Sequence, residues 1–365
     1  MYDHSSSSSY DKNSGKNIKC SYLPLTPNKK RKAFPNIENS LPTSSDVMDI
    51  ESLANEVMIN IFKFLARKEL DHCAFVNKRW NDIIRVHQQK FARRIIDKLS
   101  IYAEECNPTL INFWACSLAS TMQRHFVLDL SATNVDPGII QILKFSKVKC
   151  LVLGTINLTE GNIQKLLTIF QKADVIIMEM QMRRVNVGNI TASGFHEFCE
   201  KINAKRYGFS EMLQAENEHF GNAFFNKKIF GEAKYLFIKE ISSDETTLHI
   251  NVDDDILIDF IFGKNNESVE RKVLSLHFPS ISSDFVSKVL NRFENEPDIS
   301  HMVTEVNLTA CADQAVLRYP QYQNIILRYA NYISYNAAAD KELQAEIKKD
   351  HTGLVNVFLS IGKRY

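Results

Sequence analysis

The side chains that could carry chemistry are few in this sequence, and the densest group of them is acidic. Asp253, Asp254 and Asp255 are consecutive, and Asp259 follows four residues later. Carboxylate oxygens bind hard cations such as Ca²⁺, but a calcium loop also needs a glycine in its sharp turn, and none follows at that position. Aspartates in the first turn of a helix, where the helix dipole is positive, are the commoner explanation of such a run. We therefore expect an acidic helix start here, no metal site and no cofactor.

Histidine and cysteine also form no catalytic or metal-binding pattern. The ten histidines include no H-E-x-x-H motif, and the seven cysteines include no C-x-x-C motif. His72 and Cys73 are adjacent, so on a helix their side chains point in different directions. Glycine-rich phosphate loops and the G-x-S-x-G motif of hydrolases are absent as well. We predict that the chain is not an enzyme.

The stretch from Ile50 to Ile84 indicates protein binding instead. Its apolar residues recur four apart and form a helical stripe at Leu53, Val57, Ile61 and Leu65. Met58, Ile59 and Phe62 widen this stripe beyond what a single core contact needs. Three short helices in about 35 residues fall below the size at which an isolated core is usually stable. The surplus apolar surface therefore indicates that a partner covers it.

The spacing of these residues resembles the F-box, whose pattern runs roughly Leu-Pro-x-Glu-Val-Leu, Ile-Phe-x-x-Leu, Asp-Leu and Val-x-Lys-x-Trp. Ala54 stands where the family usually has proline, which suits a first helical turn, and Glu69 replaces the usual aspartate. The resemblance implies a three-helix module over residues 46–90 that binds a Skp-type adaptor. The adaptor contacts that it implies are Leu53, Ala54, Glu56, Val57, Ile61, Phe62, Leu65, Leu70 and Trp80. The alternative is an ordinary piece of a three-helix core.

Composition and charge exclude several other classes. The 365 residues are 44% hydrophobic and 24% charged, and a formal net charge of +1 gives no general attraction to nucleic acid or anionic membranes. No apolar run reaches the ~18 residues of a membrane span, and the N-terminus lacks the apolar core of a secretory signal. Scattered cysteines in odd number are typical of a reducing compartment. We expect a cytoplasmic or nuclear protein.

Residues 1–45 are rich in Ser, Asn, Lys and Pro, which predicts a disordered tail. The tail contains four consecutive basic residues, Lys29, Lys30, Arg31 and Lys32. Such a cluster is either a nuclear import signal or simply a solvated stretch of chain, and the sequence favours neither interpretation.

A repeat begins at Phe126. The frame Leu-x-Leu-x-x-x-Asn-[Val/Leu] starts at Leu128 and again 23 residues later at Leu151, and Leu274 starts a third copy with Ser in place of Asn. Within a unit the apolar spacing changes from two to about 3.6, which predicts a strand, a turn and a helix. Weaker copies of the strand frame begin at Val175, Leu248 and Val306, and Lys234 begins a further possible strand.

This pattern resembles the leucine-rich repeat. The resemblance implies a stack of strand–helix units over residues 126–320 whose turns are satisfied by Asn134 and Asn157. It implies a substrate-binding concave face lined by outward strand positions, namely Asp129, Ser131, Val152, Gly154, Ser275, His277, Asn307 and Thr309. These positions are equally consistent with ordinary solvated strands. Residues 183–247 show little of the frame, so a mixed α/β domain with few true repeats is the alternative.

Helices are expected on both sides of this domain. Residues 91–125 predict a helical connector: Val86–Ile101 is a connecting helix or a helix followed by a strand, and residues 103–122 carry a packing helix that begins after Pro108. Residues 321–365 predict a helical cap that includes a helix over 322–349. The predicted fold class is thus α/β, in which an all-α F-box is followed by an α/β repeat solenoid with a C-terminal helical cap.

The two resemblances together imply the substrate-recognition subunit of an SCF (Skp–cullin–F-box) ubiquitin ligase. The F-box would bind the Skp-type adaptor, and through it a cullin–RING ligase, while the repeats would bind a protein substrate. We expect no membrane partner and no small-molecule substrate. Two alternatives are an F-box scaffold outside any ligase and a nuclear factor that uses the basic tail to bind nucleic acid. The nearly neutral remainder of the chain argues against the second.

Overall fold

The computed structural model describes residues 50–104, 107–117, 122–129, 137–243, 246–247, 249–263, 272–282, 284–310, 329–349 and 354–363. By their contacts the residues divide into two units, Met1–Leu53 and Ala54–Tyr365. The first unit is described from Ile50 onward and contains the short 3₁₀ turn η1 at Ile50–Ser52. The tail predicted over residues 1–45 and its basic cluster Lys29–Lys32 lie outside the described residues. In the part of the chain that is described, no helix combines the length and apolarity needed to cross a membrane.

Three short helices open the second unit, as the sequence predicted. They are α1 (Asn55–Phe62), α2 (Arg67–Cys73) and α3 (Lys78–Val86), and a 3₁₀ turn η2 (Gln88–Lys90) follows. Asn77 begins α3 because its Oδ1 accepts a hydrogen bond from the Trp80 backbone N–H at 2.8 Å. Glu69, the third residue of α2, stabilises the start of that helix, since its Oε2 accepts a hydrogen bond from the Ala66 N–H at 2.7 Å. The glutamate that replaces the usual aspartate therefore stabilises the helix start.

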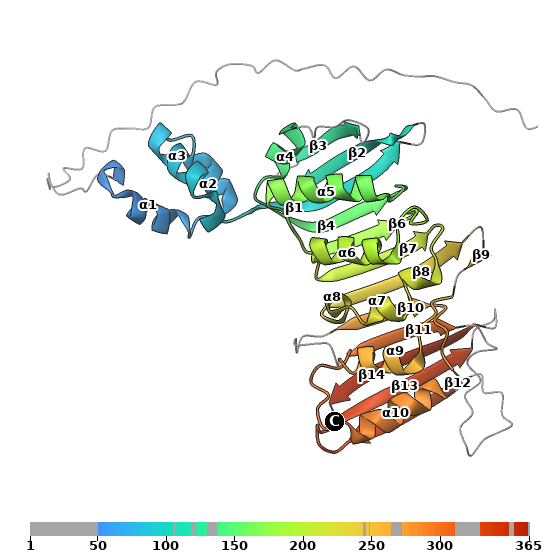
Figure 1. Cartoon of the computed structure of the whole chain (residues 1–365). Helices are drawn as coiled ribbons and strands as arrows, with labels where there is room; N and C mark the ends of the chain where they lie inside the picture. The colour runs from blue at the N-terminus through green and yellow to red at the C-terminus, as the bar shows by residue number, and fades with distance from the viewer. Residues whose placement is uncertain are drawn as a thin grey trace, which may run out of the picture. The chain divides into compact units, whose positions relative to one another are not determined.

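The described residues then form one sheet of fourteen strands (Figure 1). The strands are β1 (Arg94–Glu104), β2 (Asn107–Ser117), β3 (Met122–Asp129), β4 (Ser146–Gly154), β5 (Ile176–Ile177), β6 (Glu179–Arg183), β7 (Arg206–Met212), β8 (Tyr235–Ser243), β9 (Thr246–Thr247), β10 (Val273–His277), β11 (Glu305–Ala310), β12 (Tyr329–Asn336), β13 (Lys341–Lys349) and β14 (Val355–Lys363). Their order is β12-β13-β14-β11-β10-β8-β7-β6-β4-β1-β2-β3, with β5 beside β4 and β9 beside β8.

The centre of the sheet is parallel and follows chain order. Strands β4, β6, β7, β8, β10 and β11 are successive parallel neighbours, and β1 pairs with β4 in the same direction. Helical segments connect them and lie on one face of the sheet in Figure 1. These are α4 (Pro137–Leu143), α5 (Glu160–Ala173), α6 (Ala192–Ile202), η3 (Asn217–His219), α7 (Asn222–Phe225), α8 (Lys228–Gly231), α9 (Asp254–Ile261) and α10 (Phe285–Asn295). The opposite face of the sheet is called the open face below.

Both ends of the sheet are antiparallel, which corrects three predictions. The helical connector over 91–125 and its helix over 103–122 are wrong, because β1, β2 and β3 form an antiparallel meander there. The helical cap over 321–365 is also wrong, because β12, β13 and β14 pair antiparallel. Buried side chains alternate along β13 at Leu343, Ala345 and Ile347, and this period of two belongs to a strand packed on one face.

The predicted repeat is only partly parallel. Leu151, Leu274 and Val306 lie in β4, β10 and β11 as expected, but Leu128 lies in β3, whose partner is the antiparallel strand β2. The Leu248 copy forms no named strand where it is described, since Ile250 makes an isolated bridge to Pro279. Two parallel strands that the frame missed, β6 and β7, face the core with other apolar residues than leucine: Met180, Met182, Tyr207 and Phe209.

The asparagines predicted to close the turns do not do so as a series. Asn134 lies outside the described residues, and Asn157 is exposed. The turn after β6 is instead closed by Asn186, whose Oδ1 accepts a hydrogen bond from the Gly188 N–H at 2.9 Å. A regular buried ladder of asparagines is therefore not present among the described turns.

The centre of the core is aromatic. Phe195, Phe209, Phe220, Phe224 and Phe230 are fully buried beneath α6, α7 and α8. The Phe224 and Phe230 rings stack with centroids 3.7 Å apart. Two histidines lie among these rings, and both use backbone carbonyls: His196 Nε2 is 2.9 Å from the His219 oxygen, and His219 Nε2 is 3.1 Å from the Ile190 oxygen.

Candidate functional site

Three of the predicted adaptor contacts, Phe62, Leu70 and Trp80, lie in the interior of the three-helix part. Their side chains are at most 9% exposed, and the Phe62 ring meets the Trp80 ring edge-on with centroids 5.5 Å apart. Phe91 packs against Phe62 from the far end of the module, at 6.0 Å. These residues therefore hold α1, α2 and α3 together and would influence a partner through the shape of the module.

The other predicted contacts lie at the surface. Val57 and Ile61 on α1 are 43% and 37% exposed, although both are large and apolar. Ala54 and Glu56 are exposed at the start of the same helix. Leu53 and Leu65 are half-buried at its two ends. The helical stripe read from the sequence thus divides into a part that forms the module's core and a part that faces outward.

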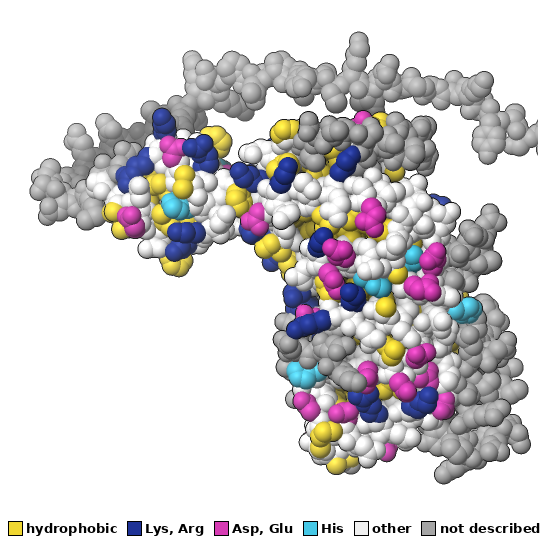
Figure 2. Space-filling model, in the orientation of Figure 1, with side chains coloured by type: hydrophobic (Ala, Val, Ile, Leu, Met, Phe, Trp, Pro, Cys, Tyr) yellow, Lys and Arg dark blue, Asp and Glu magenta, His cyan; other side chains and the backbone are white. Residues whose placement is uncertain are grey.

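Two phenylalanines that the sequence reasoning missed are more exposed than Val57 and Ile61. Phe64 follows α1 and is 90% exposed, and Phe75 follows α2 and is 88% exposed. Val76 and Val86 are also exposed, and Figure 2 shows apolar side chains on this helical part among basic ones. Burying a phenylalanine side chain is worth about 1.5–3 kcal/mol, so leaving two in water forgoes several kcal/mol. The sequence did contain a signal for these two phenylalanines, because they lie in the short connections between helices, where polar residues are usual.

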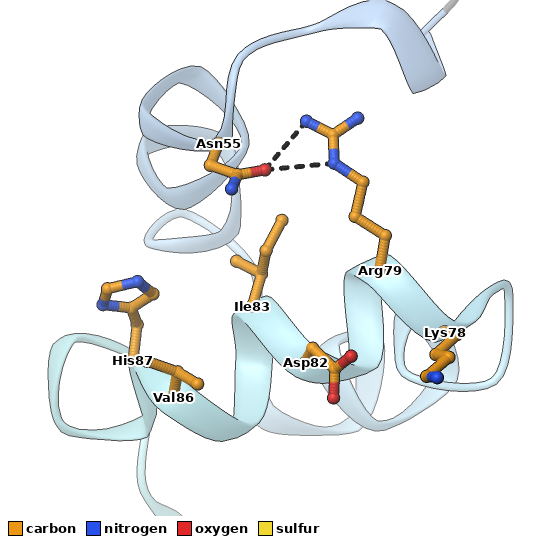
Figure 3. A pocket seen from close by; sticks show the side chains of 7 residues that line it. All are labelled: Asn55, Lys78, Arg79, Asp82, Ile83, Val86 and His87. Atoms are coloured by element: carbon orange, nitrogen blue, oxygen red, sulfur yellow. Dashed lines mark hydrogen bonds between the residues drawn. The ribbon is translucent and has the colours of Figure 1, made fainter.

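A shallow pocket of about 550 Å³ lies between α1 and α3 (Figure 3). Arg79 donates from Nε and Nη2 to Asn55 Oδ1, at 3.0 and 2.8 Å, and so links the two helices across it. The pocket's other lining residues are Lys78, Asp82, Ile83, Val86 and His87. An apolar floor with a mixed-charge rim suits a side chain of a protein partner.

The predicted substrate-binding positions fall into separate groups. Ser275 lies beside Asn307, and His277 beside Thr309, on the adjacent strands β10 and β11. Val152 and Gly154 lie on β4, which three strands separate from β10, and Asp129 lies on the edge strand β3. Ser131 lies outside the described residues. The open-face positions that connect these groups were missed: Gln181, Gly208 and Phe237 form a row with Val152 and Ser275.

Two of the four aspartates considered for metal binding, Asp254 and Asp259, are paired with cations. Asp254 lies 2.8 Å from Lys288 Nζ and also accepts from the Ser282 N–H, and Asp259 lies 2.7 Å from Arg292. Within the described ranges no cluster of three His, Cys, Asp or Glu side chains could hold a metal ion. Burial raises the pKa of Cys199, and burial together with Glu179 raises the pKa of Cys150 to about 11. Both thiols are therefore protonated and weakly nucleophilic at neutral pH.

Comparison with known proteins identifies the helical part. Residues 50–91 match the family model described as F-box-like, and this span ends at Phe91, the ring that packs against Phe62. The chain has no significant match among curated proteins or among solved structures. The chain therefore carries an F-box-like domain at residues 50–91, followed by a mixed α/β sheet domain.

Proposed function

We propose that this protein is the substrate-recognition subunit of an SCF-type ubiquitin ligase. F-box domains in general bind Skp-type adaptors, and this F-box-like domain leaves large apolar side chains in water on short helices. The exposure of Val57, Ile61, Phe64 and Phe75 is the observation that carries the proposal. Exposed apolar surface of this kind on a small module is typical of a protein-binding site.

The adaptor would cover the outward side of the module. Val57 and Ile61 would be central to this interface, and Leu53, Ala54, Glu56 and Leu65 would border them. Buried Phe62, Leu70 and Trp80 would act indirectly, by fixing the angle between the helices. Trp80 Nε1 is buried without a hydrogen-bond partner among the described residues, so the indole contributes to the domain through apolar packing.

The sheet domain would present the substrate. We interpret it as a degenerate leucine-rich-repeat-like stack, because its central strands are parallel, adjacent in chain order and connected by helical segments on one face. The antiparallel strands at both ends depart from a regular repeat. A receptor of this kind raises the effective concentration of substrate lysines near a conjugating enzyme that is loaded with ubiquitin, and it performs no chemistry itself. We accordingly place it in the cytoplasm, the nucleus or both.

The adaptor-binding half of the proposal is tested by charge on α1. The double variant Val57→Asp, Ile61→Asp should lose co-purification with a Skp-type adaptor while its circular dichroism spectrum stays that of the wild type. Both side chains are exposed, so the fold tolerates the change, but two buried charges at an interface are strongly unfavourable. The control Asn81→Asp, Gln89→Asp adds the same charge at exposed polar positions and should retain the adaptor.

Undiminished adaptor recovery by the Val57, Ile61 variant would refute the assignment. Recovery of a cullin with the wild-type protein distinguishes a ligase subunit from an F-box scaffold outside any ligase. Incubation with a ubiquitin-loaded conjugating enzyme alone should leave no ubiquitin thioester, which a reducing agent would cleave, on the protein. Such an adduct would contradict a purely binding role.

A further inference from the structure

The open face of the sheet changes its charge along the strand order. At or beside the open-face positions of β4, β6, β7 and β8, six residues are basic and two are acidic: Lys147, Lys149, Arg183, Arg184, Arg206 and Lys239 against Glu179 and Glu211. In β10, β11, β13 and β14 the same face carries three acidic residues and one basic: Glu305, Glu342, Glu346 and Lys348. The first half therefore attracts a negatively charged partner.

Aromatic rings stand at the border between these halves. Tyr235 and Phe237 on β8 lie nearly parallel, with ring centroids 6.4 Å apart, and Tyr235 is 37% exposed. Phe237 also meets the His277 ring edge-on at 6.1 Å. Together these rings form an apolar wall beside the basic strands. Aromatic side chains flanked by charged ones are typical of the centre of protein interfaces.

Gly208 leaves a notch against this wall. It lies on β7 between Gln181 and Phe237, and a Cβ added there would meet Gln181 Cγ at 3.6 Å, an ordinary contact. Gly263 differs, because it has a φ of +75° and an added Cβ would overlap the His301 carbonyl. The fold thus requires glycine at 263 but not at 208. Glycine within a strand costs about 0.5–1 kcal/mol, and it marks a bulge, a tight bend or a place where a ligand or another backbone approaches closely.

We propose that the open face over β6, β7 and β8 binds an extended acidic peptide segment whose one large apolar side chain sits above Gly208 against Phe237. This inference rests on the proposed substrate-receptor function. Arg206 lies two residues before Gly208 on β7, and Arg183 aligns with the residue two after it on β6. The Cα atoms of both arginines therefore lie roughly 7 Å from Gly208 along the strand direction, so their long side chains can reach carboxylates that flank the apolar side chain.

The ion pairs at the ends of β6 and β7 favour a peptide over a nucleic acid as the ligand of this face. Glu179 lies 3.7 Å from Arg206, and Glu211 lies 3.0 Å from Arg183 and 3.6 Å from Arg184. These carboxylates interrupt the basic surface, so a continuous phosphate backbone would meet like charge at regular intervals. A peptide with spaced carboxylates and one apolar anchor can avoid them.

The test uses the full-length protein and a short fluorescein-labelled peptide in which Asp alternates with Ser on both sides of a central Phe, and binding is measured by fluorescence anisotropy. The wild type should bind this peptide. Gly208→Trp should weaken binding about tenfold by filling the notch, and Arg206→Glu combined with Lys239→Glu should do the same by charge reversal. Matched controls lie on the same face: Gly362→Trp, where an added Cβ meets open space, and Lys348→Glu should bind as the wild type does.

Equal or tighter binding of a Lys/Arg peptide with the same central Phe would overturn the inference, and so would preferential binding of a single-stranded oligonucleotide. A folded Gly208→Trp variant with unchanged affinity would also overturn it. Should that variant unfold, the charge-reversal variant decides the same question. Adaptor recovery is measured on the same preparations. A wild type that recovers the adaptor but not the peptide refutes this inference alone, and one that binds the peptide but no adaptor refutes the proposed function alone.

Discussion

The F-box-like domain and the sheet domain use phenylalanine in opposite ways. In the sheet domain, Phe209 and Phe224 are fully buried among other rings, whereas in residues 50–91 Phe64 and Phe75 are almost fully exposed. Apolar burial is the main driving force of folding, so the sheet domain stabilises itself with these rings. The helical domain leaves two of its phenylalanine rings in water and so forgoes part of this stabilisation. The difference teaches that the sheet domain covers its large rings itself, whereas the helical domain leaves two of them for the partner that we propose.

The largest expected effect tests this contrast directly. Phe209→Ala should lower the free energy of unfolding of the sheet domain by about 3–5 kcal/mol, because it opens a cavity in a closely packed aromatic core. Phe75→Ala should change stability by less than about 0.5 kcal/mol, as exposed substitutions usually do, yet reduce adaptor recovery. Urea unfolding and adaptor co-purification of both variants make the comparison.

Phe209→Ala should thus change the stability of the protein, whereas Phe75→Ala should change its adaptor binding. A Phe75→Ala variant that unfolds as readily as Phe209→Ala would show that Phe75 is part of a core. A Phe75→Ala variant with normal stability and normal adaptor recovery would remove Phe75 from the proposed interface.

The second prediction concerns the buried histidines of the sheet core. Burial lowers the pKa of His196 below its ordinary value near 6.5, and nearby Lys227 acts in the same direction. The unfolded chain then binds this proton more readily than the folded one. Stability is therefore complete above pH 6.5 and falls as the pH drops below it, by at most about 1.4 kcal/mol per pH unit for one proton.

Thermal unfolding between pH 7 and 5 measures this slope. His196→Gln should flatten it, because glutamine can still donate toward the His219 carbonyl but does not titrate. A slope identical to that of the wild type would assign the acid sensitivity to other groups.

A third, smaller effect is expected at a buried lysine. Lys272 is 2% exposed, its Nζ donates to the Gly231 carbonyl at 3.3 Å, and burial lowers its pKa to about 8. The unfolded chain holds this proton up to pH ~10.5, so stability should rise as the pH increases from 8 to 10.5. Lys272→Met removes the buried charge and should stabilise the protein at pH 7 by about 1 kcal/mol. Urea unfolding at pH 7 and 9.5 checks both statements, and a destabilised methionine variant would contradict them.

The smallest expected effect lies at the start of the F-box-like domain. Ala54 has φ −61° and ψ 151°, and the φ value is the one that proline imposes. Ala54→Pro should therefore stabilise the protein by about 0.4–1 kcal/mol, chiefly by restricting the unfolded chain. The melting temperature measures the gain, with Ala66→Pro as a contrasting variant, because the Ala66 N–H donates to Glu69 and proline lacks this donor. A loss of stability in Ala54→Pro would show that the alanine is required.

The sequence predicted the helical domain well because its signals are local. Leu70 and Trp80 stand at fixed distances on short helices, and the caps at Asn77 and Glu69 lie within three residues of their partners. The sequence could not show that Val57 faces outward and Phe62 inward. That depends on how α3 and Phe91 pack against α1, which the spacing of residues along α1 does not specify.

The ends of the sheet were misread because distant strands decide their structure. Residues 322–349 have helical composition, but Ala337 to Ala339 lie between β12 and β13, outside both strands. Pairing of β13 with β14 overrides the weak local preference. Two strands at the centre of the sheet, β6 and β7, were missed for another reason. The Leu frame excluded Met182 and Phe209, although any large apolar side chain can fill the same inward position.

The antiparallel ends of the sheet also have a consequence for the order of folding. Hairpins such as β1–β2 and β12–β13 join neighbouring segments and close short loops, which is fast, whereas the parallel pair β8–β10 must bring together residues almost forty positions apart. We expect the two flanks to gain structure first and the parallel middle last. The strands that carry the proposed peptide site are in that middle, so capture of a substrate would require a receptor that has finished folding.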